Sequence, residues 1–195
     1  MTENTIASFK DAVAASTDVI EFDVWLTLDD VIVVFHDKTF ERMTAGSCDS
    51  TVTSCRYDEI PPLVPVPGQR DRCSNFNEAD CYRVPTFEHV LDVLPSTMLI
   101  NIEVKQDSDL LIDKINQILM ERNRVQYTYC FSLDKKINNK IRNKIQNITT
   151  ITSKADILEI ALLYWIGMLP FCVIRHDVYG FSFQEVHHSL HFYSV

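Results

Sequence analysis

Two acidic residues in the stretch from Val19 to Thr44 have a spacing that could bind a metal ion. Glu21 and Asp23 are two positions apart in an alternating segment, so both lie on one face of a predicted strand while apolar residues occupy the other face. Burying two carboxylates without partners costs free energy, and a divalent cation that prefers oxygen ligands, Mg²⁺ or Ca²⁺, would offset that cost. An edge strand with both carboxylates in solvent explains the same spacing. These residues alone do not decide between the two interpretations.

A histidine follows in the same stretch. After Asp29 and Asp30, a second apolar strand is predicted over 31–36, and it ends at His36. Histidine changes charge near neutral pH and binds metals through its ring nitrogens. His36 is therefore a candidate general acid or base, or a candidate metal ligand. A histidine that is simply on the surface is the alternative.

A strand further along the chain repeats the alternation. Over 98–105, Asn101, Glu103 and Lys105 share one face and apolar residues share the other. A parallel strand that is buried on both faces should be a continuous apolar run. Three polar residues on one face therefore predict that this face looks into a site. Lys105 could be an ordinary surface lysine, but its place two residues after Glu103 favours a functional role.

The elements that must position these residues alternate along the chain. Strands are predicted over 19–25, 31–36, 98–105, 126–132 and 148–151. Helices are predicted after a cap at Asn4 or Thr5, after Thr86, over 109–122 and over 134–146, with irregular chain over 45–84. This order favours an α/β fold with a parallel sheet, and a (β/α) barrel is the leading candidate. The strands are too few to close an eight-stranded barrel.

Composition and charge narrow the class of protein. The chain has 195 residues, enough for one domain with a sizeable core, and 46% of them are hydrophobic, as in a globular protein. The net charge of −9, with no long basic block, argues against nucleic acid as a partner. The six cysteines lack the spacing of a zinc site, so no cysteine-held metal is expected.

One run near the C-terminus is long and apolar. The segment 157–174 contains one charged residue, Glu159, and is at the lower limit of length for a membrane span. Tyr164 and Trp165 are of residue types enriched at membrane interfaces, which favours membrane contact over a buried helix that ends at Pro170. Three later histidines are expected to lie in a solvated tail and not to form a ligand set: His187, His188 and His191.

Five sequence blocks resemble those of the glycerophosphodiester phosphodiesterase family in order and spacing. They are ENTIASF, EFD, FHDKTFERMT, VPTFEHVLDVLP and INIEVK, and the resemblance extends from residue 3 to about residue 174. Two further blocks, SCRYDEIPPL and LLYWIGMLPFCVIR, are similar to the membrane-associated lysophospholipase D members of animals. The resemblance implies a partial TIM-type (β/α) barrel of the phosphatidylinositol-phosphodiesterase-like kind, in a single domain over 1–195.

The resemblance also implies roles for individual residues. It implies one divalent metal, Mg²⁺ or Ca²⁺, with the ligands Glu21, Asp23, His36 and Glu103. His36 would also act as general acid or base, and Lys105 would lie beside the phosphate as a point charge. Arg42 is interpreted as a structural partner of Asp37.

The activity implied by the resemblance is hydrolysis of a phosphoric diester in lipid metabolism. Lysophospholipids or glycerophosphodiesters would yield lysophosphatidic acid or glycerol 3-phosphate and an alcohol such as choline, ethanolamine or an N-acylethanolamine, at the endoplasmic reticulum or another intracellular membrane. The family pattern has a His-Arg-Gly strand before the ENT block and further strands after the last one here, so the domain is expected to be incomplete at both ends. The 195-residue chain alone is then expected to be nearly inactive. The alternative is a truncated, catalytically dead product that keeps a metal- or lipid-binding surface.

Overall fold

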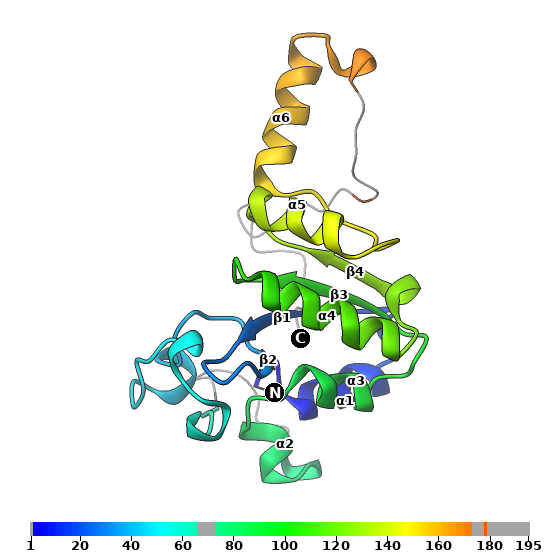
Figure 1. Ribbon diagram of the computed structural model, residues 1–195. Coiled ribbons are helices and arrows are strands. Elements are labelled where there is room, and N and C mark those ends of the chain that lie inside the picture. Colours follow the sequence, from blue (N-terminus) through cyan, green and yellow to red (C-terminus); the bar gives the residue numbers. More distant parts are fainter. Residues whose placement is uncertain (1, 66–72, 173–177, 179–195) are drawn as a thin grey trace.

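A four-stranded sheet organises the protein, as seen in a computed structural model that describes residues 2–65, 73–172 and 178 (Figure 1). The strands lie in the order β2-β1-β3-β4. Their bounds are β1 (Val19–Leu26), β2 (Ile32–Val34), β3 (Leu99–Val104) and β4 (Thr128–Phe131). β1 pairs with β3, and β3 with β4, in parallel, whereas β2 is antiparallel to β1. The sheet is therefore α/β in type, as predicted, with one antiparallel strand at its edge.

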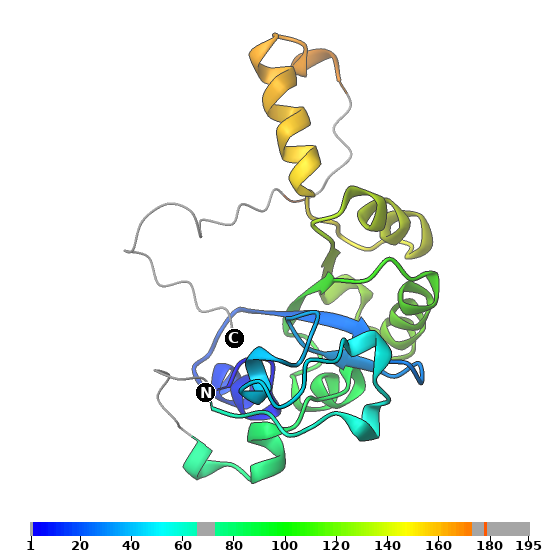
Figure 2. The same ribbon diagram turned by 90° about the vertical axis from the view of Figure 1, so that its left-hand side faces the viewer.

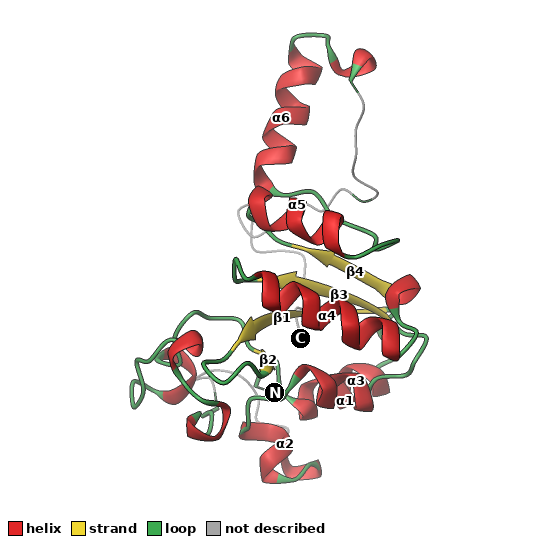
Figure 3. Ribbon diagram, viewed as in Figure 1, coloured by secondary structure: helices red, strands yellow, loops and turns green. Residues whose placement is uncertain are grey.

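Side-chain caps mark where several helices begin. Thr5, Thr86 and Ser108 each accept a hydrogen bond from a backbone N–H three residues further on, which satisfies a donor that the helix leaves unpaired. Of the two caps predicted for the first helix, Thr5 is the one observed. The helices, red in Figure 3, are α1 (Ile6–Ala14), α2 (Glu78–Tyr82), α3 (Phe87–Val93), α4 (Asp109–Glu121), α5 (Lys135–Lys144) and α6 (Lys154–Trp165).

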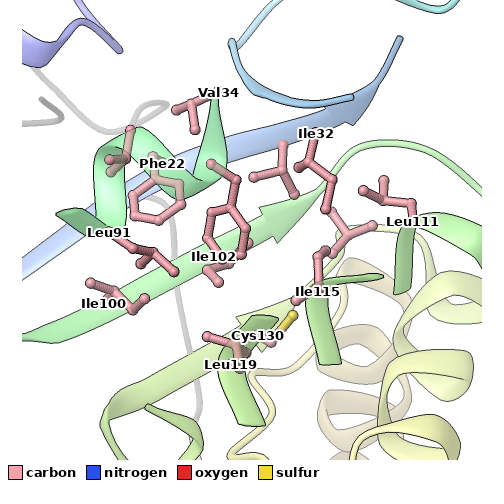
Figure 4. Close-up of a cluster of buried hydrophobic side chains, with 14 of the residues drawn as sticks. Phe22, Ile32, Val34, Leu91, Ile100, Ile102, Leu111, Ile115, Leu119 and Cys130 are labelled. Carbon is pink, nitrogen blue, oxygen red and sulfur yellow. The ribbon is translucent and has the colours of Figure 1, made fainter. Parts of the chain in front are cut away.

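The main hydrophobic core lies between the sheet and helices α1, α3, α4 and α5. Figure 4 shows Phe22 of β1 and Ile102 of β3 pointing into this core, and both are completely buried. The ring of Phe22 contacts Phe9 of α1 edge-on at 5.7 Å between centroids, and it also packs against Phe87 of α3 at 6.0 Å. Because side chains alternate along a strand, the residues between these apolar ones lie on the opposite face of the sheet.

A smaller core holds the long segment after β2 against the sheet. Its buried members are Trp25, Val33, Phe35, Phe40, Met43, Val52, Cys55, Leu63 and Val84. The irregular chain predicted over 45–84 is interrupted by α2, which Asn77 caps through the backbone N–H of Asp80. A five-residue helix is too short to display a helical period, so the sequence pattern missed it.

Two predicted elements differ from the structure. The segment 148–151 makes isolated bridges and no continuous ladder, because β4 is only four residues long and offers few pairing positions. The first part of the apolar run lies in α6, which ends at Trp165 and is largely exposed. The alternative prediction, a buried helix that ends at Pro170, is therefore wrong. Within the described residues, no helix combines the length and apolar character needed to cross a bilayer. The solvated tail was predicted to contain His187, His188 and His191, and these three residues lie outside the described part of the chain.

Candidate metal centre

Three carboxylates meet on the sheet face that is opposite the main core. In the parallel register of β1 with β3, Asp23 lies beside Glu103 and Glu21 lies beside Asn101. Glu21, Asp23 and Glu103 each place a carboxylate oxygen within 4.8 Å of the other two. Asp23 and Glu103 are buried and Glu21 is half-buried, so the solvated edge-strand interpretation is wrong. The structure brings three of the four predicted metal ligands into one cluster.

Lys105 supplies positive charge to this cluster. Its Nζ lies 2.8 Å from Asp23 Oδ1 and 2.9 Å from Glu103 Oε2, and its side chain keeps 16% exposure. Apart from this ion pair, the buried Asp23 Oδ1 accepts no hydrogen bond from any described residue. The oxygen is therefore held near a cation while its lone pairs remain available.

Two of the carboxylates have raised pKa values, because the positive charge near them does not compensate for burial and for the neighbouring negative charges. Burial, together with the charges of Asp23 and Glu103, raises the pKa of Glu21 to about 8. Burial also raises the pKa of Glu103, although Lys105 opposes the rise. Burial by itself would lower the pKa of Lys105, but its two carboxylate partners outweigh burial and raise it. At neutral pH the cluster therefore retains a proton unless a further cation enters.

His36 lies in a neighbouring group and not within the carboxylate cluster. Its Nδ1 is 2.7 Å from Asp37 Oδ1, its side chain is 56% exposed, and Glu3 completes a second set of closely spaced potential ligands. Arg42 binds Asp37 through Nε at 2.5 Å and also pairs with Glu3. The predicted Arg42–Asp37 pair is confirmed, and it neutralises part of this second group. His36 lies near enough for a charge on its ring to counteract the raised pKa of Glu103, so the two groups are neighbours.

Asn4 contributes to the site in a way that the sequence reading missed. The sequence pattern indicates Asn4 only as a possible helix cap. In the structure its Nδ2 donates to Asp23 Oδ2 at 3.3 Å, while its Oδ1 is buried without a partner among the described residues. Its φ of +54° lies in the left-handed region, which asparagine tolerates better than most residues. An asparagine at the mouth of a helix, before an acidic strand, is the signal that could have indicated it.

Comparison with known proteins assigns the chain to a family. The Glycerophosphoryl diester phosphodiesterase family matches residues 1–164. The chain belongs to this family. It is 32% identical to lysophospholipase D GDPD1 of Rattus norvegicus over 188 residues, which are 94% of this chain and 58% of that protein. It is 30% identical to a glycerophosphodiester phosphodiesterase of Caldanaerobacter subterraneus, over 86% of this chain and 63% of that protein. The chain thus spans less than two thirds of these relatives.

Solved structures of the same family share the fold. A glycerophosphoryl diester phosphodiesterase domain from Mycobacterium tuberculosis superimposes with a TM-score of 0.67 at 18% identity, over 85% of this chain and 60% of that chain. The glycerophosphodiester phosphodiesterase of Thermotoga maritima gives a TM-score of 0.60 at 19% identity, covering 85% and 64% respectively. The predicted fold class, a partial TIM-type (β/α) barrel, is confirmed.

The donor set of the cluster fits the divalent cation that this family generally uses. All three groups offer carboxylate oxygens, the ligands that Mg²⁺ and Ca²⁺ prefer. Three carboxylates and one ammonium leave two negative charges in excess when all are ionised, and one divalent cation would balance them. The poorly paired Asp23 Oδ1 and the raised pKa of Glu21 are the local signs of that excess. The residues present therefore fit a hard divalent cation.

Proposed function

We propose that this site hydrolyses the phosphodiester of lysophospholipids or glycerophosphodiesters, as a metal-dependent lysophospholipase D. Products would be lysophosphatidic acid or glycerol 3-phosphate and an alcohol such as choline, ethanolamine or an N-acylethanolamine. The single observation that carries the proposal is the buried cluster of Glu21, Asp23 and Glu103 with Lys105 beside it. Two relatives support the substrate class, because their names describe a lysophospholipase D and a glycerophosphodiester phosphodiesterase.

The three carboxylates would hold one Mg²⁺ or Ca²⁺, which when bound supplies charge stabilisation to the phosphate oxygens. Lys105 has a second task at the same place. Its Nζ is shared between two carboxylates and partly open to solvent, so it can turn toward a phosphate oxygen as a point charge. A phosphodiester gains negative charge on the way to its transition state, and a fixed ammonium lowers that barrier electrostatically.

His36 is suited to proton transfer. Because Asp37 holds its Nδ1, the Nε2 atom remains the one that can give a proton to a leaving alkoxide or take one from a water molecule. Arg42 keeps Asp37 in place, and so it orients the imidazole indirectly. The exposure of His36 suits a group that must meet a substrate arriving from outside.

The proposal is tested by measuring choline release from lysophosphatidylcholine and from glycerophosphocholine, with Mg²⁺ or Ca²⁺ added or chelated. Glu103→Gln and His36→Ala should each reduce release, and loss of a general acid or base typically costs about 10²–10⁴-fold in rate. Glu88→Gln and His89→Ala change the same residue types at exposed positions of α3 and should leave release unchanged. The same variants are also assayed in a chain extended by a His-Arg-Gly strand before Glu3.

Two outcomes count against the proposal. Release that persists under chelation would remove the metal from the reaction. Calorimetric binding of the cation without any release, in the extended chain as well, would favour the catalytically dead product that only binds metal. Placement at the endoplasmic reticulum or another intracellular membrane stays a prediction.

A further inference from the structure

Trp25 continues the face of β1 that carries the carboxylates. Side chains alternate along a strand, so Asp23 and Trp25 point to the same side of the sheet. Asp23 lies beside Glu103 in the parallel register, and this pairing reaches Lys105 through a hydrogen bond of 3.2 Å from its backbone N–H to Val24 O. Continued in the same register, Trp25 is the neighbour of Lys105 across the two strands, one row beyond Asp23 and Glu103.

The indole of Trp25 lies at the border between this polar face and the smaller core. On its other side Trp25 pairs with Val33 of β2, which is completely buried in that core. The segment that follows β2, cyan in Figures 1 and 2, covers this end of β1, where Leu28 N donates to Cys55 O at 2.9 Å. Trp25 therefore has apolar packing on one side and the charged side chain of Lys105 on the other.

The N–H of this indole is a donor without an acceptor. Trp25 is 9% exposed, its Nε1 is closed to solvent, and no described residue accepts a hydrogen bond from it. A buried donor that stays unpaired costs free energy, so a buried tryptophan usually has a partner. The smaller core also contains Phe35 and Phe40, whose rings pack there without that cost. The N–H of Trp25 therefore indicates an acceptor that is not among the described residues.

The neighbouring side chains indicate what kind of acceptor this is. Indole nitrogen only donates, so its partner carries a lone pair and is not a cation. Lys105 is the group that we expect beside the phosphate, and its Nζ must turn away from Asp23 and Glu103 to reach it. Such a turn changes the surroundings of the indole N–H, which is covered in the free protein. A phosphate oxygen is ionised and is therefore a strong acceptor at this place.

We propose that Trp25 is a substrate-binding residue whose Nε1–H donates a hydrogen bond to a phosphate oxygen beside Lys105. The inference rests on the proposed function, because that function brings the phosphate to Lys105. An ammonium is a point charge on a flexible stem and does not set the orientation of a phosphate. A donor on a ring held by the smaller core is directional, so Trp25 would orient the phosphate that Lys105 attracts.

Binding of glycerol 3-phosphate in the presence of Mg²⁺ tests the inference without turnover. Trp25→Phe removes the N–H and keeps an aromatic ring in the core. Calorimetry should show that this variant binds glycerol 3-phosphate, and also inorganic phosphate, about 10-fold more weakly than the unchanged protein, the loss expected for a hydrogen bond to a charged group.

Val52→Ala is the matched control for packing. Val52 is completely buried in the same smaller core and has no polar side-chain atom, so its truncation weakens the packing and removes no donor. This variant should bind both phosphate compounds as the unchanged protein does. Urea unfolding of Val52→Ala and Trp25→Phe shows how much stability each has lost.

A fluorescence measurement does not depend on how Trp25→Phe folds. The sequence has two tryptophans, so Trp165→Phe leaves Trp25 as the only reporter. Saturating glycerol 3-phosphate should change the emission of Trp25, because its N–H gains a charged acceptor. In the Trp25→Phe protein the reporter is Trp165, which is 84% exposed on α6, and its emission should not change.

Three results would overturn the inference. Equal affinities of Trp25→Phe and the unchanged protein, or an emission of Trp25 that saturating ligand does not alter, would do so and would leave the proposed hydrolysis standing. An equal loss of affinity in Val52→Ala would attribute the effect to core packing. If the unchanged protein binds neither phosphate compound with Mg²⁺ present, the phosphate site of the proposed function fails together with the role of Trp25.

Discussion

Two regions of the molecule place side chains in unfavourable surroundings. One is the carboxylate face of β1 and β3, and the other is the exposed apolar surface of residues 158–171, which we call the apolar projection. The first buries charge and the second exposes apolar surface to water. A cation would lower the free-energy cost of the buried carboxylates, whereas only apolar atoms that cover the exposed side chains would lower theirs. The comparison shows that buried charge indicates a charged ligand, whereas exposed apolar surface indicates an apolar contact.

The two regions also differ in how firmly they are held. The carboxylates sit on strands that are paired on both sides, above a core that contains Phe22 and Ile102. The projection is tied to the domain through its first turn, by the Ser153 capping box and the Lys135 ion pairs. A preorganised site suits a small ion, whose ligands must keep fixed positions.

The largest expected effect is the loss of cation binding when carboxylates are removed from the sheet face. The double variant Glu21→Gln/Asp23→Asn takes away two of the three carboxylate ligands, so calorimetry should detect no Mg²⁺ or Ca²⁺ binding. Asp58→Asn/Glu59→Gln makes the same change at exposed positions and should bind as before. Unaltered cation binding in the first variant would show that the cluster is not the metal centre.

A second prediction removes the positive charge that Lys105 supplies to the carboxylate cluster. Lys105→Met leaves Asp23 and Glu103 without their ammonium partner, and breaking such a pair costs about 3 kcal/mol when some solvent remains near it. Urea unfolding should show this loss, and added Mg²⁺ or Ca²⁺ should recover part of it. Lys38→Met, at an exposed position, is the control. A Lys105→Met protein as stable as the unchanged one would contradict the shortage of positive charge.

A pair of alanine substitutions compares how much each region contributes to stability. Phe22→Ala opens a cavity between α1 and α3 and should cost about 3–5 kcal/mol of unfolding free energy, because its ring is buried against two others. Leu162→Ala in α6 should change that free energy by less than about 0.5 kcal/mol, because the side chain is largely exposed. A large loss from Leu162→Ala would mean that the projection is packed against the domain in solution.

A pH dependence of stability is expected from the core side of the sheet. Complete burial raises the pKa of the Cys130 thiol from 9.0 to about 12. Between those values the folded protein keeps a proton that the unfolded chain releases, so raising the pH favours unfolding. At pH 10 this should cost about 1.4 kcal/mol of stability relative to pH 7. The loss should be absent from Cys130→Ala, and equal slopes for both proteins between pH 8 and 10 would refute it.

What could be predicted from the sequence follows from short-range patterns. Alternation of apolar and polar residues places Glu21, Asp23, Glu103 and Lys105 on strand faces, because side chains of a strand point to opposite sides in turn. Hydroxyl caps such as Thr5 and Thr86 indicate where their helices begin, since each hydroxyl accepts a hydrogen bond from a backbone N–H only three residues away. These inferences require no knowledge of what lies across the fold.

Tertiary structure decided which of these groups meet. Asp23 and Glu103 become neighbours only through the register of β1 with β3, which core packing selects and no local pattern encodes. The same holds for Asn4 beside Asp23, and for His36, which pairs with Asp37 outside the carboxylate cluster. Arg124 is nearly completely buried because two backbone carbonyls, of Pro95 and Met98, accept its hydrogen bonds.

The apolar run shows the same division between sequence and fold. The sequence by itself determined that the run has few charges and aromatic residues near its middle. Only the fold decided that the run begins as a helix outside the core, because α1, α3, α4 and α5 already cover the apolar face of the sheet. Local periodicity indicates how a segment could pack. Whether it does pack depends on whether the other helices leave part of the sheet's apolar face uncovered.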